Sequence, residues 1–392
     1  MSSEQLMTTE QVAYRLGVKP STVYAYVSRG ILTSRRNAAG KGSLFAKSDV
    51  DDLIASRKRA TPNIQTGITL IRNGELFYRG HDVTALARTE PYEAVANLLW
   101  DGDLRFERFA INRDLSLLAH RIGKLLPPTA RLADRLRVTV AAIATADPLR
   151  FDTSPTAVAN TARTLIATMV DALPSRAGLR PLQPDSLAES LWYHLTEHPL
   201  TDDGRRTLNG ALVLLADHDI AASTLAARVA ASTRADPYAV ISAGLAALDG
   251  PLHGAASEQV HPLLAEALTG TDPIGIISER LRTSGGLPGF GHPLYPSGDP
   301  RAAALFDLLG DHPVSDAATR LAAAVRTRSG IVPNIDLALA TLTLRYDMPP
   351  DAGEAIFAVA RTAGWLAHAL EEYANRPARF RPTGQYSGRP PA

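Results

Sequence analysis

Long stretches rich in alanine and leucine dominate the chain from about residue 92 onward. The segments YEAVANLLW, ALVLLADHDIAASTLAARVAAST and GEAIFAVARTAGWLAHALEEY place apolar residues three and four positions apart, which is the spacing of an α-helix. Proline, glycine and aspartate residues separate these segments and are typical of helix starts and stops. No unit of about 20 to 50 residues recurs, so the pattern does not indicate a solenoid. The sequence therefore predicts a mainly α-helical body.

The composition is that of a folded protein with several domains. Hydrophobic residues make up 45% of the 392 positions, and a chain of this length has room for two or three domains and a large core. No apolar run approaches the roughly 18 residues of a membrane span. The start, MSSEQLMTTE, lacks the basic and then apolar layout of a signal peptide. We therefore expect a cytoplasmic protein with no membrane partner.

Cysteine is absent from the sequence, which restricts the chemistry of the chain. A protein without cysteine has no disulfide, no thiolate nucleophile and no thiolate metal ligand. Acyl-transfer chemistry would have to use histidine, aspartate, serine or lysine instead.

The first 60 residues form a small basic region. They carry ten Lys or Arg against five Asp or Glu, a net +5, so the overall +1 leaves −4 for the remainder. Thr8 and Gln11 make a Thr-x-x-Gln capping box for a first helix that stops at Gly17. A second helix is expected from Pro20 to Arg29, with Gly30 as its stop. Two short helices joined by a tight turn predict a helix-turn-helix.

A wing and a third helix are expected next. Arg35 and Arg36, followed by the turn Gly40-Lys41-Gly42, predict a small basic hairpin. Ser48 is the expected cap of a helix that runs to about Lys58. A basic front end of this kind is typical of a nucleic-acid-binding appendage, although a solvated charged face produces the same bias.

The second helix of this region has a polar outer face, because Val23 and Val27 occupy the inward positions. TTEQVAYRLGVKPSTVYAYVSRGIL resembles the excisionase and MerR-like winged helix-turn-helix family. In that family the second helix enters the DNA major groove and the wing touches phosphate. The resemblance implies DNA contacts from Ser21, Thr22, Tyr26, Arg29, Arg35, Arg36 and Lys41. Alternatively, the domain only packs on its neighbour or mediates assembly.

Beyond a linker at Thr61-Pro62-Asn63, the segment ITLIRNGELFYRG predicts one hairpin with an Asn73-Gly74 turn. Further on, the glycine- and proline-rich stretch SGGLPGFGHPLYPSGDPR, residues 284 to 301, excludes regular structure. Glycines allow close approach of a ligand to the backbone, and prolines restrict the loop. We interpret this stretch as a binding site.

The same stretch ends in a helix start. Asp299 is a good N-cap and Pro300 a good first helical residue. A cation in the first turn opposes the helix dipole. Arg301 is therefore either retained to bind an anion or simply exposed.

Two short motifs that contain histidine lie in the helical body. His194 and His198 in HLTEH match a zinc pattern, but Pro199 stops the helix and no further carboxylate ligand is apparent. We therefore expect a surface helix end and no metal site. In the segment Asp217-His218-Asp219, two carboxylates beside one imidazole would raise the histidine pKa and suit it to anion binding. The alternative is a helix end with solvated charges.

Two further side chains occupy the starts of predicted helices. His253 in GPLHGAASE lies just before a helix, where an imidazole is biased toward the neutral form that can hydrogen-bond a developing oxyanion. A capping histidine is the alternative. Asp336 in VPNIDLALATLTL precedes an apolar helix, and the default prediction is an N-cap.

Arg361 lies on an apolar helix face. It shares that face with Phe357 and Trp365, so its guanidinium is expected to enter an apolar region and to need an anion there. Glu354 and Glu371 are the internal candidates, and a bound acid is the other possibility.

Five of these segments occur in the order found in the citrate synthase family, which the chain resembles over about residues 63 to 388. LLADHDIAAST looks like that family's histidine-bearing helix, GPLHGAASE its first catalytic histidine segment, GFGHPLYPSGDPRA its second, PNID its catalytic aspartate segment and RPTGQYSG its C-terminal arginine segment. The resemblance implies a helix-turn-helix domain at 1–60 and a synthase-like body at 61–392. The body would have a large domain, about 61–236 and 346–392, and a small domain, about 237–345.

The resemblance also implies roles for individual residues. Asp336 would remove a methyl proton from acetyl-CoA, His253 would hydrogen-bond the thioester oxygen, and His292 would polarise the keto carbonyl of oxaloacetate. The substrate carboxylates would be held by His218, Arg301 and Arg361, with Arg381 coming from the second subunit of a homodimer. CoA would contact Gly286, Leu287, Gly289, Gly291 and Asn334. Acetyl-CoA is then a substrate, and neither a cofactor nor a metal is expected.

Some positions depart from the family pattern. Pro293 follows the second histidine, Ala222 replaces an asparagine, and Gly254-Ala255-Ala256-Ser257 replaces Gly-Gly-Ala-Asn. None of these changes removes a catalytic group, but they leave propionyl-CoA and a 2-methylcitrate product open. A hypothesis from a different class is a transcription regulator whose synthase-like body senses acyl-CoA or a keto acid without turnover.

Overall fold

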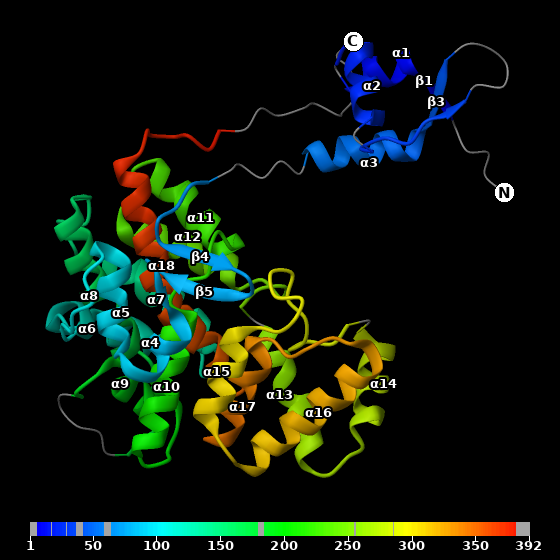
Figure 1. The fold of residues 1–392 in the computed structure, drawn as a ribbon. Coiled ribbons are helices and arrows are strands. Elements are labelled where there is room, and N and C mark those ends of the chain that lie inside the picture. The colour runs from blue at the N-terminus through cyan, green and yellow to red at the C-terminus, as the bar shows by residue number, and fades with distance from the viewer. Residues whose placement is uncertain are drawn as a thin grey trace. The chain divides into compact units, whose positions relative to one another are not determined.

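The computed structural model describes residues 6–16, 18–28, 30–36, 42–58, 64–178, 184–254, 256–284 and 286–381. The chain divides into two compact units, Met1–Gln65 (unit 1) and Thr66–Ala392 (unit 2), drawn in Figure 1. Each unit has its own apolar core. Within the described residues, no helix combines the length and the apolar character that crossing a lipid bilayer requires.

Unit 1 combines short helices with a small antiparallel sheet of strand order β1-β3-β2. Its elements are β1 (Leu6–Thr8), α1 (Thr9–Leu16), α2 (Pro20–Ser28), β2 (Arg35–Arg36), β3 (Ser43–Ala46) and α3 (Lys47–Lys58). The predicted helix-turn-helix and wing are confirmed. Strand β1 was not predicted, because three residues are too short to show alternation.

The caps and the core of unit 1 explain its helices. Thr8 and Gln11 form the reciprocal capping box, since each backbone N–H donates to the other side chain, at 2.9 and 3.3 Å. Ser48 is not a cap, because α3 begins one residue earlier at Lys47. Val12, Val23 and Phe45 belong to the buried core, which fixes the two helices against the sheet.

Unit 2 begins with a hairpin. β4 (Thr69–Arg72) and β5 (Glu75–Tyr78) pair antiparallel across Asn73 and Gly74. Both turn residues have positive φ, 56° and 82°, which this tight hairpin turn requires. The hairpin is confirmed, and a short third strand, β6 (His81–Asp82), extends it.

The regular structure in the rest of the described part of unit 2 is almost entirely helical, which confirms the mainly α-helical prediction. The helices are α4 (Val83–Thr89), α5 (Tyr92–Asp101), α6 (Arg113–Gly123), α7 (Leu132–Ala144), α8 (Pro155–Asp171), α9 (Leu187–Leu195), α10 (Asp202–Leu215), α11 (Ala222–Ser232), α12 (Pro237–Leu248), α13 (Ala256–Leu268), α14 (Pro273–Ser284), α15 (Pro300–Leu309), α16 (Pro313–Ser329), α17 (Ile335–Arg345) and α18 (Ala352–Ala374).

Helix α18 is the centre of the larger apolar core. It packs against α5, α7, α8, α10, α11 and α12, and Figure 1 shows it running between several of these helices. Nearly every residue from Ala352 to Ala369 is buried. Trp365 is fully buried against Gly244 of α12, where a Cβ would lie 2.7 Å from the indole ring. A glycine is therefore needed for this close helix contact.

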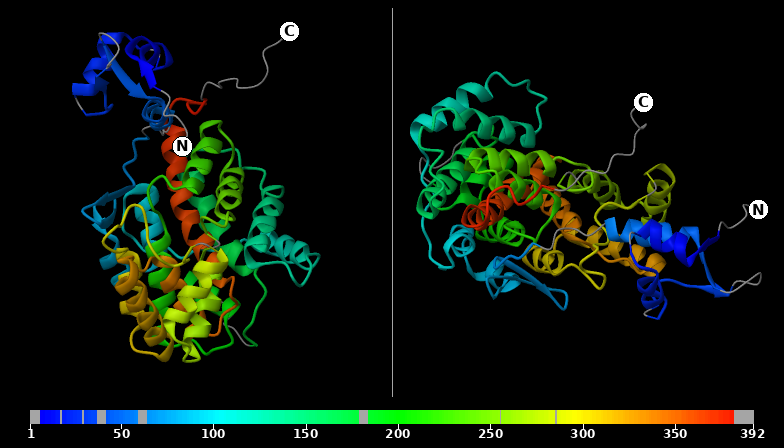
Figure 2. Two further views of the ribbon diagram at one scale, coloured as in Figure 1. Left: turned by 90° about the vertical axis from the view of Figure 1, so that its right-hand side faces the viewer. Right: turned by 90° about the horizontal axis from the view of Figure 1, so that it is seen from above.

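A second apolar cluster joins α13, α14, α16 and α17, with Val260, Leu264, Ala317 and Leu337 among its members. Figure 2 shows these yellow-green to orange helices grouped together in both views. Side chains of α12, although within the range predicted for the small domain, belong to the larger core instead. Helix α17 contributes residues to both clusters.

Two helical predictions need correction. The segment with Asp217, His218 and Asp219 is a break between α10 and α11, where Asp219 has a φ of 53°. Helix α9 ends at Leu195, so His198 lies outside it. His194 is buried, which is contrary to the expected surface helix end.

Candidate active site

The glycine-rich loop is held against the start of α17. The backbone N–H of Gly291 donates to the Val332 carbonyl at 2.8 Å, and that of Asn334 donates to the Gly289 carbonyl at 3.0 Å. The Asn334 side chain donates to the Gly291 carbonyl at 3.0 Å. Gly289 has a φ of +85°, and a Cβ there would lie 2.9 Å from Val260. Glycine is therefore required at this position.

This loop borders a cavity of about 570 Å³. The other walls come from the break before α11, the turn before α13 and the starts of α15 and α17, with a face of α18. The predicted residues that line the cavity are His218, His253, Gly286, Leu287, Gly289, Gly291, His292, Arg301, Asn334, Asp336 and Arg361. Segments more than 140 positions apart in the sequence thus meet at one site.

His253 lies in the turn between α12 and α13. Its Nε2 is 2.7 Å from the hydroxyl of Ser223, and its ring meets Phe357 edge to face at 5.7 Å. Burial, and to a lesser degree Arg361, lowers the His253 pKa to about 4. The imidazole is therefore neutral at physiological pH. Ser223 was not predicted, because nothing in a helix-start serine signals a histidine thirty residues away.

Two more imidazoles line the cavity and meet edge to face. The ring centroids of His218 and His292 are 5.2 Å apart, and His218 Nε2 is 2.9 Å from the hydroxyl of Tyr295. Burial, and then Arg301, lowers the pKa of both histidines. Both rings are neutral hydrogen-bonding groups at physiological pH.

The structure corrects the prediction for the carboxylates beside His218. The expected rise in its pKa is wrong, because burial dominates. Asp217 is buried rather than solvated, and its carboxylate accepts from the Thr69 hydroxyl at 2.5 Å and lies 3.2 Å from His368 Nε2. His218 therefore lies at a helix end that is part of the protein interior.

Asp336 is the second residue of α17 and not its cap. Asn334 is the N-cap, and its side-chain oxygen accepts from the Asp336 backbone N–H at 3.0 Å. The default capping interpretation of Asp336 is therefore wrong. Burial raises the Asp336 pKa to about 7, with opposing contributions from Arg301 and Asp299. A carboxyl with such a pKa can take up and release a proton near neutral pH.

Arg301 is buried and already paired. Its Nε and Nη2 donate to the two carboxylate oxygens of Asp299 at 2.9 and 2.8 Å. Asp299 is also the predicted N-cap of α15, and it accepts from the Ile335 backbone N–H at 3.1 Å. The ion pair therefore joins the starts of α15 and α17 at the cavity wall.

Arg361 is buried with one donor group unused. Its Nε donates to the Leu215 carbonyl at 2.7 Å, and its guanidinium lies 4.6 Å from the Phe357 ring centre. Among the described residues, Nη2 has no hydrogen-bond partner. Within the described residues, neither carboxylate that was predicted as an internal partner of Arg361 pairs with it. Glu354 lies 3.6 Å from Arg131, and Glu371 pairs with Arg228. An unpaired buried cation at a cavity favours an anionic ligand.

A chain of buried polar groups leads away from the site. Arg228 Nη1 lies 2.5 Å from His368 Nδ1 and also donates to Glu371 at 2.7 Å, while its Nε donates to Glu372 at 2.6 Å. Because a guanidinium can only donate, His368 Nδ1 must be unprotonated. Its Nε2–H is therefore directed to Asp217, which fixes the residue that precedes His218. His368 was not predicted, since a histidine in an apolar helix has no distinguishing spacing.

Other predicted residues lie elsewhere. Arg381 is exposed and does not line the cavity. The remaining part of the C-terminal arginine segment, residues 382–388, lies outside the described residues, as do Arg29 and Lys41. For Arg36 the structure describes only its place in β2.

On α2, Ser21 is exposed and Thr22 partly so, and Arg35 is exposed on the wing. Tyr26 is partly buried and packs against the core of unit 1. The exposed tyrosines are Tyr24 of α2, at 52%, and Tyr14 of α1, at 92%. Tyr26 is less exposed than expected, because position 26 lies three residues after the buried Val23 on the same helix face. Its contact with DNA stays a prediction.

Comparison with known proteins identifies both units. The family model of the citrate synthase C-terminal domain matches residues 58–383, and that of a helix-turn-helix domain matches residues 6–58. The citrate synthase of Synechocystis sp. is 32% identical over 81% of this chain and 86% of its own length. The citrate/2-methylcitrate synthase of Bacillus subtilis is 31% identical over 81% and 91%.

A solved structure of Thermoplasma acidophilum citrate synthase, in a ternary complex with carboxymethyl coenzyme A and oxaloacetate, has a TM-score of 0.71 and 27% sequence identity to this chain. The match covers 86% of this chain and 97% of the Thermoplasma chain. The chain belongs to the citrate synthase family of acyltransferases and carries a helix-turn-helix domain ahead of its synthase body.

Proposed function

We propose that this protein condenses acetyl-CoA with oxaloacetate to give citrate and CoA. The observation that carries the proposal is that a carboxyl with a pKa near 7, Asp336, lines the same cavity as the neutral imidazoles of His253 and His292. Ionised Asp336 takes a proton from the methyl group of the thioester. Because that methyl is a very weak carbon acid, the thioester oxygen must be stabilised at the same moment. His253 supplies the hydrogen bond that does so.

The resulting enol-type carbon attacks the keto carbon of oxaloacetate. His292 hydrogen-bonds the keto oxygen and provides its proton as the carbon–carbon bond forms. Water then cleaves the citryl thioester, which releases CoA and citrate. A neutral imidazole suits both donor roles, since its N–H strengthens its hydrogen bond as charge develops on oxygen.

The charges of the cavity fit a dicarboxylate. Arg361 lines the cavity, and its buried Nη2 has no hydrogen-bond partner among the described residues. Burial lowers its pKa only to about 10, so it stays cationic. His218 and Arg301 complete the proposed carboxylate contacts. Guanidinium groups match carboxylates geometrically. CoA is proposed to run along the loop of Gly286, Leu287, Gly289 and Gly291, with Asn334 beside it.

Propionyl-CoA is a second acyl donor to test, because the Bacillus subtilis relative is named for both products. The assay measures thiol release from acetyl-CoA and from propionyl-CoA with oxaloacetate. We expect turnover with at least one, and a loss of roughly 100- to 10,000-fold in Asp336→Asn. Asp316→Asn, the same change in the first turn of α16, is the matched control and should keep full activity. Absence of turnover with every acyl donor would refute the proposal.

A homodimer with Arg381 reaching the partner's cavity is part of the proposal, since Arg381 does not line the cavity of its own chain. Mixing Asp336→Asn with Arg381→Ala chains should restore activity, because one of the two sites in a mixed dimer then has both groups intact. No recovery, with each variant inactive alone, would place Arg381 in its own chain's site.

DNA binding is a second candidate function and rests on unit 1. Its fold, its family match and the exposed Ser21 and Arg35 support contacts to a duplex. A mobility-shift assay of the full chain on fragmented genomic DNA should give a complex that weakens in Ser21→Glu, with thiol release unchanged. Equal shifts for both proteins would argue against this surface.

A further inference from the structure

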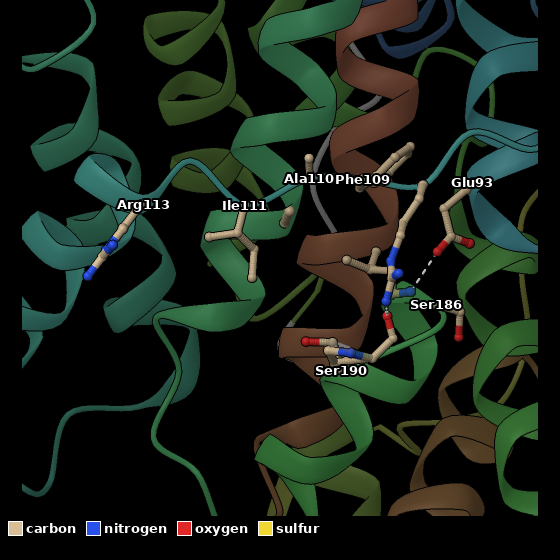
Figure 3. A pocket seen from close by; sticks show the side chains of 11 residues that line it. Glu93, Phe109, Ala110, Ile111, Arg113, Ser186 and Ser190 are labelled. Atoms are coloured by element: carbon tan, nitrogen blue, oxygen red, sulfur yellow. Dashed lines mark hydrogen bonds between the residues drawn. The ribbon is translucent and has the colours of Figure 1, made fainter. Parts of the chain in front are cut away.

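A second cavity of about 600 Å³ lies apart from the proposed active site and shares none of its lining residues. Its walls are α5, the segment 108–113 that leads into α6, one face of α8 and the start of α9 (Figure 3). Volumes of roughly 300 to 1,000 Å³ are typical of small-molecule sites. The cavity is therefore large enough for a ligand.

Glu93 of α5 borders this cavity with a buried carboxyl group. Its side chain is buried, at 1% exposure, and Oε1 accepts from the Leu187 backbone N–H at 2.6 Å. Within the described residues, Oε2 has no partner. Figure 3 shows the carboxyl above Ser186 in the pocket wall. A buried carboxylate oxygen without a donor is costly, so a ligand that donates a hydrogen bond there would be favoured.

A cation borders the same space. Arg108 lines the cavity and opposes the rise in the Glu93 pKa that burial causes. Its guanidinium donates to the Pro184 carbonyl, which uses only part of its five N–H groups. A carboxylate and a guanidinium on one cavity are complementary to a molecule that carries both an ammonium and a carboxylate group.

The floor between these groups and Arg113 is apolar. Phe109 and Ala167 are buried, while Ile111 is 44% exposed. Figure 3 places Ile111 between Glu93 and Arg113, which lies at the far side of the pocket. The body of a fitting ligand is therefore apolar.

We propose that this cavity binds a free α-amino acid with an apolar side chain. Its ammonium group pairs with the Glu93 carboxylate, its carboxylate accepts from Arg108, and its side chain packs on Phe109, Ile111 and Ala167. The site is independent of the proposed synthase chemistry, because binding requires no residue of the active-site cavity.

Isothermal titration of the full chain with each of the common amino acids tests the proposal. We expect binding of leucine- or phenylalanine-type amino acids. Two leucine analogues each lack one of its charged groups: 4-methylpentanoate lacks the ammonium group, and 3-methylbutylamine lacks the carboxylate. Both should bind at least about 10-fold more weakly, as expected for a lost charge-assisted hydrogen bond. No binding of any amino acid at about 10 mM, or binding of these analogues equal to that of leucine, would overturn the proposal.

Two variants locate the site. Glu93→Gln keeps an oxygen for the Leu187 N–H but loses the charge, and should weaken binding about 10- to 100-fold. Ser190→Leu adds an apolar side chain to the pocket from α9 and leaves Glu93 unsubstituted, and should abolish binding while the far-ultraviolet circular dichroism stays native. Glu354→Gln, at a buried carboxyl outside this cavity, is the matched control and should bind normally. Unchanged affinity in either pocket variant places the ligand elsewhere and overturns the assignment.

Discussion

At the scale of single residues, burial sets the protonation state of the groups in the active-site cavity. It lowers the pKa of His218, His253 and His292 and raises that of Asp336. The imidazoles are therefore neutral donors at the pH at which the carboxyl begins to ionise. One carboxylate base beside neutral donors is the combination that enolisation of a thioester needs.

The pKa of Asp336 has opposite consequences for activity and stability. Only the ionised carboxyl accepts a proton, so kcat/KM, which reports the pKa of the free enzyme, should rise as the pH increases through about 7. The folded-state pKa exceeds the unfolded value of 3.8, so the folded state binds the proton more tightly. This group's contribution to the free energy of unfolding therefore falls as the pH rises from about 4 to about 7.

Asp336→Asn removes the ionisable group. At about pH 8 we expect this variant to be nearly inactive yet more stable than the parent by on the order of 1 kcal/mol. Urea unfolding at about pH 5 and pH 8 measures the difference, which should shrink at the lower pH. An activity profile that is flat through neutral pH, or a variant less stable at the higher pH, would contradict this assignment.

Arg361 offers a test of the anion site. Arg361→Lys keeps the positive charge but loses the guanidinium fork and its bond to the Leu215 carbonyl. We expect KM for oxaloacetate to rise by about 10-fold or more, with a smaller change in KM for the acyl-CoA. Steady-state kinetics with each substrate varied in turn will measure both. Glu354→Gln is the control on the same helix, and an equal effect there would point to a general defect of α18.

At the scale of elements, most helices could be predicted from spacing and caps, as for Asp299 and α15. The errors arose where tertiary contacts overrule local pattern. The α10–α11 break lies within a continuous apolar segment, and it is stabilised by contacts of Asp217 with Thr69 and His368. The cap of α17 is Asn334 because its side chain also braces the glycine loop. In both cases the residues that make the contact lie more than 40 positions apart in the sequence.

The glycine loop is the element that shapes the proposed CoA contact. Gly289→Ala would place a Cβ 2.9 Å from Val260 at a φ of +85°, a conformation that residues with a side chain rarely adopt. We expect the loop to shift, with KM for acyl-CoA raised several-fold and KM for oxaloacetate less affected. Gly275→Ala in α14, with nothing within 4 Å of its Cβ and outside the active-site cavity, is the matched control. Equal kinetics for both variants would show that the Gly289 conformation does not matter for binding.

At the scale of the whole molecule, neighbouring carboxylates of α18 bind residues from both the first and the last described segments of the synthase unit. Glu371 accepts from the Thr66 hydroxyl at 3.1 Å and the Gly67 backbone N–H at 2.8 Å. Glu372 accepts from Arg379 Nε at 2.7 Å. These carboxylates meet at Arg228, which contacts His368 and through it the residue before His218. Sequence spacing could not predict this connection, because its members lie up to about 300 positions apart.

Two truncated chains distinguish the contribution of the helix-turn-helix unit from that of these polar contacts. A chain that begins at residue 64 keeps the contacts of Thr66 and Gly67 with Glu371, and its kcat/KM should stay within about twofold of the full chain. A chain that begins at residue 68 loses both hydrogen bonds and leaves the Glu371 oxygen without its donors. Its free energy of unfolding should fall by roughly 1 to 3 kcal/mol, and its KM for oxaloacetate should rise, because Asp217 and His218 are at the other end of the polar chain. Urea unfolding and thiol release measure the two effects. If the longer chain were already impaired, unit 1 would have to support the active site directly; if the shorter one were unaffected, the polar chain would end at Arg228 without influence on His218.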